Sequence, residues 1–181
     1  GADEDFTSRI QERFSRPWFR VYTNDDLLGV ELAGATKNII AIAAGILDGL
    51  AMGDNAKAAL LTRGLAEISR LGMELGARAE TFAGLAGVGD LVTTCISPMG
   101  RNRSFGQAVG EGKTVAEAGE AAGETGAVVE GVATTASVVA LARQIGVEMP
   151  ITQAVHDVLF SGIKPAEAIK SLMSRPLKRE A

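Results

Sequence analysis

The sequence is poor in the residues that cross-link small proteins or ligate metals. It contains one cysteine, Cys95, and one histidine, His156, among 181 residues. A single cysteine excludes an internal disulfide and fits a reducing compartment, so we expect a cytoplasmic protein. One histidine cannot build a histidine-rich metal site, and no cysteine–histidine cluster exists, so we expect no metal ion. We interpret both residues as structural, since Cys95 has no cation beside it in the sequence to activate its thiol.

Aromatic residues and runs of one charge are also scarce. Aromatic residues make up 4% of the chain, whereas glycine is abundant, with 22 copies. This composition favours helices that pack closely through small side chains. The formal net charge is -4 and no run of five basic residues occurs, so nothing electrostatic supports a nucleic-acid or membrane-surface role. The longest uncharged apolar run, residues 39–47, is far shorter than the roughly 20 residues that span a bilayer.

The first part of the chain has a different pattern from the rest. Phe6, Ile10 and Phe14 recur every four residues, which predicts a short amphipathic helix over residues 2–15. Residues 19–24 then alternate apolar and polar side chains, which predicts one strand. A single strand is not stable alone, so this pair of elements indicates the tail of an α/β domain.

Strand signals nearly vanish after residue 24. A glycine-rich turn is expected over residues 80–89, and Asp54 is expected to cap the helix that follows it. Periodicity, caps and prolines predict helices over residues 29–48, 56–75, 90–95, 101–109, 129–145, 150–160 and 165–173, with one more opened by the capping box Thr114–Glu117.

The most apolar stretch carries a candidate acid/base. Residues 29–48 are nearly continuous in small and aliphatic side chains, which places this helix in the middle of a helical domain. Lys37 lies in it, and its neighbours one helical turn away are all small or apolar. Burial of the ammonium would lower its pKa toward the range useful for proton transfer. The alternative is a lysine that lays its stem along an apolar surface, and this stretch alone leaves both open.

Three further groups of polar residues could complete a site. Asp90 and Thr94 are four residues apart and share a helix face, so Asp90 could orient Lys37 or merely cap its own helix. The sequence Arg101-Asn102-Arg103 opens a predicted helix just after a glycine. An arginine at a helix N-terminus suits a phosphate group, although these cations could equally form a solvated face. Glu130 is the last candidate, and sequence distance alone does not show whether the groups meet.

Four blocks of sequence resemble one family. They are GVELAGATKNIIAIAAG from residue 29, GDNAKAAL from residue 53, GVGDLVTTC from residue 87 and RNRSFG from residue 101. Their order and context resemble NAD(P)-dependent glycerol-3-phosphate dehydrogenase of the bacterial type, over essentially the whole chain. The resemblance covers only the C-terminal part of the family's polypeptide.

The resemblance implies a fold and a domain organisation. Residues 25–181 would be a mainly α, multi-helical substrate-binding and catalytic domain of the 6-phosphogluconate dehydrogenase C-terminal-like kind. Residues 1–24 would be the tail of an N-terminal Rossmann domain, as a helix and its last strand. NAD or NADP would be bound mainly by that missing domain, which would also hold the residues that choose between the two. The chain alone would then be inactive.

The resemblance also implies roles for the residues around the lysine. Lys37 matches the general acid/base that protonates the C2 oxygen of dihydroxyacetone phosphate and removes that proton in the reverse direction. Asp90 matches the catalytic carboxylate paired with this lysine. Asn38 and Thr94 match residues that contact the substrate beside them.

A second set of roles concerns phosphate and cofactor. Arg101 and Asn102 match the substrate-phosphate contacts. Gly100 stands where bacterial members often carry serine, so only its backbone could serve the substrate. Arg101, Val128 and Glu130 match positions that reach the cofactor from the helical domain.

The implied function is the interconversion of dihydroxyacetone phosphate and sn-glycerol 3-phosphate with NAD(P)H, a source of glycerophospholipid precursor, by a homodimer. Two alternatives remain open. A related two-domain hydroxy-acid dehydrogenase should lack the pairing of the Arg101-Asn102 anchor with Asp90. A non-catalytic helical dimerisation module would dimerise yet ignore phosphate ligands.

Overall fold

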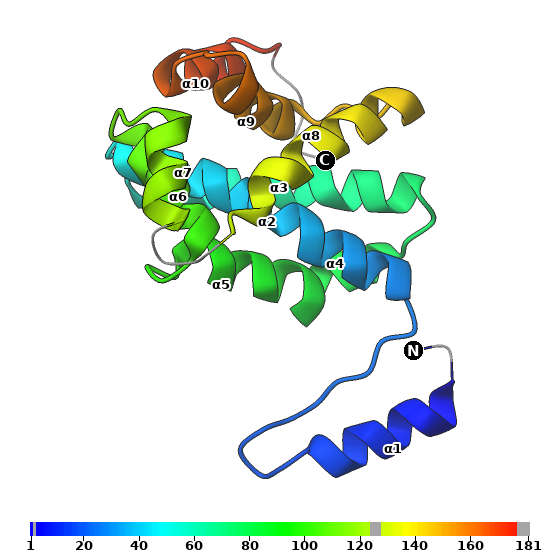
Figure 1. Cartoon of the computed structure of the whole chain (residues 1–181). Helices are drawn as coiled ribbons and strands as arrows, with labels where there is room; N and C mark the ends of the chain where they lie inside the picture. Colours follow the sequence, from blue (N-terminus) through cyan, green and yellow to red (C-terminus); the bar gives the residue numbers. More distant parts are fainter. Residues whose placement is uncertain (2, 124–127, 177–181) are drawn as a thin grey trace.

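The computed structural model describes residues 1, 3–123 and 128–176, and these are largely helical (Figure 1). Within these ranges there is no strand, and the one β-type pairing is an isolated bridge between Arg16 and Phe19. The mainly α fold is therefore confirmed. The elements are α1 Glu4–Phe14, α2 Leu27–Gly49, α3 Gly53–Glu74, α4 Ala79–Ala83, the π-helical turn η1 Leu85–Gly89, α5 Asp90–Ile96, α6 Arg101–Gly110, α7 Val115–Gly123, α8 Glu130–Ile145, α9 Pro150–Phe160 and α10 Pro165–Met173.

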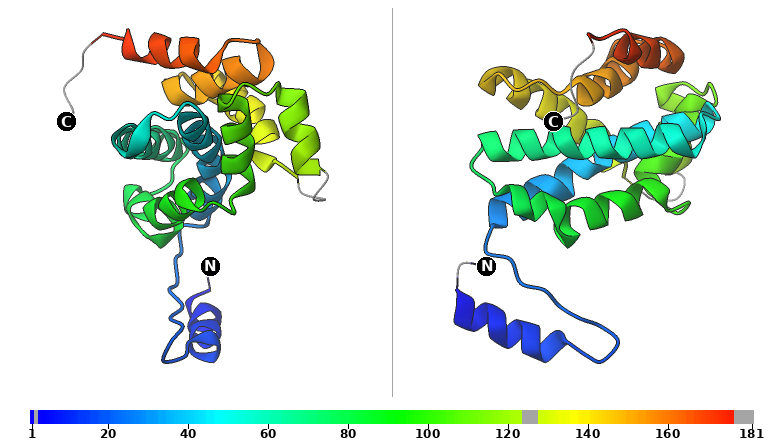
Figure 2. Two further views of the ribbon diagram at one scale, coloured as in Figure 1. Left: turned by 90° about the vertical axis from the view of Figure 1, so that its left-hand side faces the viewer. Right: turned by 180° about the vertical axis from the view of Figure 1, so that it is seen from behind.

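Helix α2 is the centre of the helical body, as its apolar sequence predicts. It packs against α3, α5, α6, α8 and α9, and most of its second half is buried (Figure 2). Asp26 caps its start, because Asp26 Oδ1 accepts a hydrogen bond from the N–H of Gly29 at 3.0 Å. By length and composition alone α2 could cross a membrane. Its enclosure by the other helices is that of a core helix.

Glycines bring the backbones of α2 and α6 into direct contact. A Cβ atom on Gly45 would lie 1.9 Å from the carbonyl oxygen of Arg103, and one on Gly106 would lie 2.1 Å from that of Ile42. No larger residue fits at either position without moving a helix. The contact seats the first turn of α6 on the second half of α2, close to the candidate site.

The N-terminal segment stands apart from this body (Figures 1 and 2). Helix α1 is capped by Asp3, whose Oδ1 accepts from the N–H of Phe6 at 2.8 Å. The chain then returns along α1, where Gln11 Nε2 donates to the carbonyl of Val21 at 2.8 Å. The strand predicted over residues 19–24 is wrong. A strand needs a partner for its backbone groups, and the described residues provide none.

Two other local predictions are wrong. Asp54 does not cap α3, which begins one residue earlier and has no side-chain cap. The glycine-rich residues 80–89 form α4 and η1 instead of a turn. A Cβ atom on Gly87 would lie 2.0 Å from the carbonyl oxygen of Phe82, so this glycine serves close helical packing.

Most helix boundary signals are confirmed. In the capping box, the N–H of Thr114 donates to Glu117 Oε2 at 2.8 Å, and the N–H of Glu117 donates to Thr114 Oγ1 at 3.2 Å. Pro150 and Pro165 are the first residues of α9 and α10. Gly146 ends α8 with a φ of 75°, a conformation that favours glycine.

Helix α9 is anchored by a buried carboxylate. Glu67 on α3 accepts from the N–H groups of Ile151 and Thr152 at 2.6 and 3.2 Å, and from the Thr152 hydroxyl at 3.3 Å. These bonds satisfy free N–H groups at the start of α9. Burial raises the pKa of Glu67 to about 7, although the hydrogen bonds oppose the shift.

Candidate functional site

The structure brings Lys37 and Asp90 together from helices that are far apart in sequence. Lys37 Nζ donates to Asp90 Oδ2, and the two side chains are 20% and 40% exposed. Thr94 Oγ1 donates to the carbonyl of Asp90 at 2.7 Å and lies 3.3 Å from Asp90 Oδ1. Lys37 is thus a partly buried ammonium held by a carboxylate, not a lysine with its head free in water. This arrangement can pass a proton to an oxygen placed beside it.

Both α5 and η1 pack against α2, which places Asp90 beside that helix. Asp90 is the first residue of α5 and directly follows η1, a single π-helical turn. Such turns are rare and are frequently found at functional sites. The cap of α5 is Gly89, with no side-chain hydrogen bond, so Asp90 is free of the capping role that the sequence left open.

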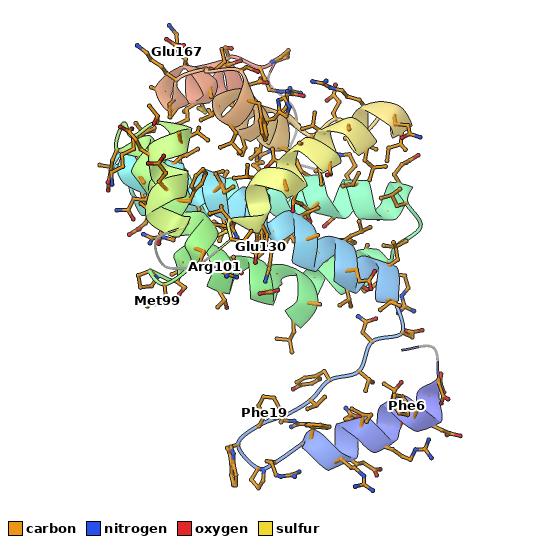
Figure 3. All side chains as sticks on the ribbon, viewed as in Figure 1. Phe6, Phe19, Met99, Arg101, Glu130 and Glu167 are labelled. Carbon is orange, nitrogen blue, oxygen red and sulfur yellow. The ribbon has the colours of Figure 1, made fainter. Side chains whose placement is uncertain are left out.

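The start of α6 forms the second part of the site. Arg101 Nη2 donates to Glu130 Oε1 at 2.9 Å, and both side chains are about half exposed, at 53% and 47%. Figure 3 shows these two side chains next to each other between α6 and α8. Asn102 is buried, and its Oδ1 accepts from the N–H of Gly131 at 2.9 Å. Arg101 therefore faces the surface while Asn102 ties α6 to α8.

The two parts meet at Gly131, a residue that sequence reasoning missed. A Cβ atom there would lie 2.7 Å from Asn102 Oδ1 and 2.9 Å from the carbonyl oxygen of Asn38. The first turn of α8 therefore fits between Asn102 and the residue next to Lys37. The only sequence signal for it is a glycine at a predicted helix start. This packing links the lysine side to the arginine side, a question that sequence distance left open.

Gly100 has a more limited role than the sequence suggested. Its N–H donates to the carbonyl of Ser97 at 3.1 Å, and its carbonyl accepts from the N–H of Ser104 at 2.8 Å. The N–H of Gly100 is thus used within the turn. The N–H groups that the first turn of α6 leaves without intrahelical partners belong to residues 101–103. Together with the positive end of the helix dipole and Arg101, these groups can hold an anion.

Val128 and Glu130 lie at the exposed edge of the same site. Val128 is exposed just before α8, and Met99 is exposed on the loop before α6 (Figure 3). An exposed apolar side chain therefore stands two residues before each member of the Arg101–Glu130 pair. Asn38 is half-buried on α2, beside Lys37.

The lone cysteine and histidine lie outside this site. Cys95 is buried, and burial raises the pKa of its thiol to about 12, so the thiol is unreactive at neutral pH. The ring of His156 lies 5.0 Å from that of Phe160, and its Nδ1 lies 3.4 Å from Asp157 Oδ1. Among the described residues, no group of three or more histidine, cysteine or acidic residues could hold a metal ion.

A protein-family model and curated relatives that match this chain all carry the name of one enzyme family. Residues 26–170 match the family model described as NAD-dependent glycerol-3-phosphate dehydrogenase C-terminus. A curated glycerol-3-phosphate dehydrogenase (NAD(P)+) of Koribacter versatilis is 55% identical over 179 residues, which are 99% of this chain and 52% of the relative. One of Geobacillus kaustophilus is 59% identical over 173 residues, which are 95% of this chain and 49% of the relative.

Solved structures agree with the sequence matches. The crystal structure of glycerol-3-phosphate dehydrogenase from Coxiella burnetii is 48% identical, with a TM-score of 0.89 over 96% of this chain and 52% of that chain. The enzyme from Saccharomyces cerevisiae is 30% identical, with a TM-score of 0.82 over 93% of this chain and 48% of that chain. The chain spans about half the length of the relatives that it matches. It therefore belongs to the family of NAD-dependent glycerol-3-phosphate dehydrogenase C-terminal domains.

Proposed function

We propose that this chain is the substrate domain of an enzyme that interconverts dihydroxyacetone phosphate and sn-glycerol 3-phosphate with NAD(P)H. The observation that carries the proposal is the Lys37–Asp90 pair packed, through Gly131, beside the Arg101-Asn102 helix start. One part can move a proton and the other can hold a phosphate group. The names of the relatives give the same activity.

Lys37 acts as the general acid/base. Charge builds on the C2 oxygen of dihydroxyacetone phosphate as the ketone is reduced, and the Lys37 ammonium gives that oxygen its proton. In the reverse direction the neutral amine removes the proton. Asp90 keeps the Lys37 side chain in place, and Thr94 in turn fixes the Asp90 carboxylate.

Arg101 and the free N–H groups of α6 hold the substrate phosphate. A guanidinium and a helix N-terminus both favour a dianion. Since the phosphate is remote from C2, its binding energy can orient the carbonyl toward Lys37. Asn102 shapes this part of the site by fixing α6 against α8.

The exposed edge of the site fits a nicotinamide cofactor. It offers a guanidinium and a carboxylate at Arg101 and Glu130, beside the exposed apolar side chain of Val128. These are suitable contacts for a molecule with phosphate groups, hydroxyls and a flat ring. When bound, the nicotinamide would supply or accept the hydride at C2.

The remaining cofactor contacts are proposed to come from an N-terminal dinucleotide-binding domain, of which residues 1–24 would be the tail. In support, this segment stands apart from the helical body and exposes large apolar side chains, among them Phe6, Phe14, Trp18 and Phe19 (Figure 3). Exposed apolar groups of this size usually mark a contact surface. We further propose a cytoplasmic homodimer that supplies glycerophospholipid precursor, in line with the expectations from sequence.

The test is Lys37→Met in the polypeptide extended upstream to its natural start. We expect kcat to fall by roughly 100- to 10,000-fold, the usual contribution of a general acid/base. Lys170 is exposed on α10, so Lys170→Met is the matched control and should leave kcat unaltered. Circular dichroism would verify that both variants fold. An unchanged kcat in folded Lys37→Met would refute the assigned role.

A further inference from the structure

A second cluster of charged side chains lies beside the site and has no role so far. Asp48 is near the end of α2, Lys57 is in the first turns of α3, and Arg103 is in the first turn of α6. Lys57 Nζ pairs with Asp48 Oδ1, and Arg103 Nη2 lies 2.6 Å from Asp48 Oδ2. One carboxylate on α2 thus joins this helix to α3 and to α6, each through one charged partner.

The cluster is more buried than the Arg101–Glu130 ion pair, and slightly more than Lys37, which is 20% exposed. Its side chains are between 15% and 18% exposed, whereas those of Arg101 and Glu130 are about half exposed. Asp48 Oδ2 and Arg103 Nε have no hydrogen-bond partner among the described residues, so charge, not aligned hydrogen bonding, holds Arg103 there. Buried ion pairs are costly to desolvate and are weak evidence for a stabilising role. A positional role is the better explanation.

The element that this ion pair positions is the first turn of α6. Its three consecutive side chains go to three different partners: Arg101 to Glu130, Asn102 to Gly131 and Arg103 to Asp48. Successive residues on a helix are about 100° apart, so the direction of one side chain fixes the directions of the others. The backbone is seated as well, because the carbonyl of Arg103 lies against Gly45.

The same helix that carries Asp48 carries Lys37. The two residues are eleven positions apart on α2, which is about three turns, so they lie on nearly the same face. Asp48 thereby ties the start of α6 to the rigid element that holds the acid/base.

We propose that Arg103 and Asp48 are positioning residues for the substrate phosphate: their buried ion pair sets the rotation of the first turn of α6, so that Arg101 and Asn102 point toward the site. This inference rests on the proposed function. Lys57 pairs with the other carboxylate oxygen of Asp48 and so ties the start of α3 to the same ion-pair cluster. Arg103 itself does not contact the substrate.

The test compares variants of the full-length enzyme on dihydroxyacetone phosphate and on dihydroxyacetone, which lacks the phosphate. Arg103→Met removes the charge but leaves Asp48 and Lys57 as a balanced pair, so the domain should still fold. We expect KM for dihydroxyacetone phosphate to rise about 10-fold, with kcat changed less than about 3-fold, because a misplaced anchor weakens binding. Turnover of dihydroxyacetone should be unaltered. Arg103→Lys keeps the charge and should restore much of the affinity.

The controls separate this inference from the proposed function. Glu67→Gln alters a buried carboxylate on α3 that holds the start of α9, away from α6, and should leave KM unchanged even if it lowers stability. If the wild-type enzyme fails to use dihydroxyacetone phosphate, the proposed function fails. If the wild-type enzyme uses dihydroxyacetone phosphate, two results for Arg103→Met overturn the positioning role. One is an unchanged KM and kcat, and the other is a lower kcat with an unchanged KM. Should Arg103→Met not fold, Arg103→Gln, which also removes the charge, takes its place, and an unchanged KM for dihydroxyacetone phosphate in that variant overturns the positioning role.

Discussion

At the scale of single residues, Arg101 is the group to which we assign recognition of the substrate phosphate. It is half exposed, and within the described part of the chain it pairs with the exposed carboxylate of Glu130. Arg101→Ala should therefore cost little stability. Hydrogen bonds to charged groups contribute about 1.5–3 kcal/mol, so kcat/KM for dihydroxyacetone phosphate should fall roughly 10- to 100-fold, mainly through KM. Steady-state kinetics of the full-length enzyme would measure this fall in kcat/KM and the rise in KM.

Arg143→Ala is the matched control, because Arg143 on α8 donates to Gln153 on α9, away from the start of α6. It should leave KM unchanged. If Arg101→Ala also leaves KM unchanged, the phosphate is held elsewhere.

Glu67 makes stability depend on pH. Its pKa of about 7 in the folded chain lies above the ordinary value of 4.5, so folding favours the protonated form. The free energy of unfolding should therefore decrease as pH rises from about 4.5 to about 7, and level off above that range. The shift corresponds to about 3 kcal/mol. Urea unfolding of wild type and Glu67→Gln at pH 5 and pH 8 measures it.

Glutamine has no charge to desolvate, so Glu67→Gln should lose less stability than wild type between the two pH values. The comparison cancels contributions from other titrating groups, which both proteins share. An equal loss in both proteins would mean that Glu67 is ionised throughout, held by the N–H groups of Ile151 and Thr152.

At the scale of elements, the contact between α2 and α6 depends on glycine. Gly45→Ala and Gly106→Ala each place a Cβ atom about 2 Å from a carbonyl oxygen of the other helix. Overpacking of this kind costs about 1–3 kcal/mol, so both should lower the melting temperature of the chain.

Gly34→Ala is the control on the same helix, since a Cβ atom there meets nothing within 4 Å. Alanine is the better helix former by about 0.5–1 kcal/mol, so this variant should be as stable as wild type or more so. If Gly45→Ala matches Gly34→Ala in a thermal melt, the helices do not touch as described.

The elements that the sequence predicted well are those set by local signals. Helical periodicity, prolines at helix starts and the capping box Thr114–Glu117 each act within one helix. They could therefore be recognised in the sequence without knowledge of the fold. The strand over residues 19–24 failed because pairing depends on a second strand. The turn predicted over residues 80–89 failed because glycines in a sequence usually signal a turn, whereas Gly87 allows close helical packing onto the carbonyl of Phe82.

In the candidate site, too, local features could be predicted from the sequence, whereas contacts between distant residues could not. Residue types and helical spacing indicated Asp90 with Thr94, and the start of α6 as an anion site. The pairing of Lys37 with Asp90 was one of two possibilities, because residues 53 positions apart meet only through packing. Asp48 and Lys57 gave no signal, since each is an ordinary charge near a helix end in the sequence.

At the scale of the whole molecule, the proposed acid/base pair and the proposed anion site lie on one helical body and are linked by the packing of Gly131 between Asn102 and Asn38. The N-terminal segment stands clear of that body with its apolar side chains exposed (Figure 1). The chain is about half as long as its relatives. This arrangement is what we expect of a substrate domain that meets a cofactor domain.

The most direct test follows nicotinamide absorbance with the full-length enzyme and either dihydroxyacetone phosphate or dihydroxyacetone. The proposed function predicts turnover of the phosphorylated substrate, with kcat/KM for dihydroxyacetone lower by at least about 100-fold, because the anchor at Arg101 aligns the carbonyl with Lys37. Equal turnover of both would contradict the phosphate anchor. No turnover of either, with the cofactor bound, would contradict the dehydrogenase activity itself.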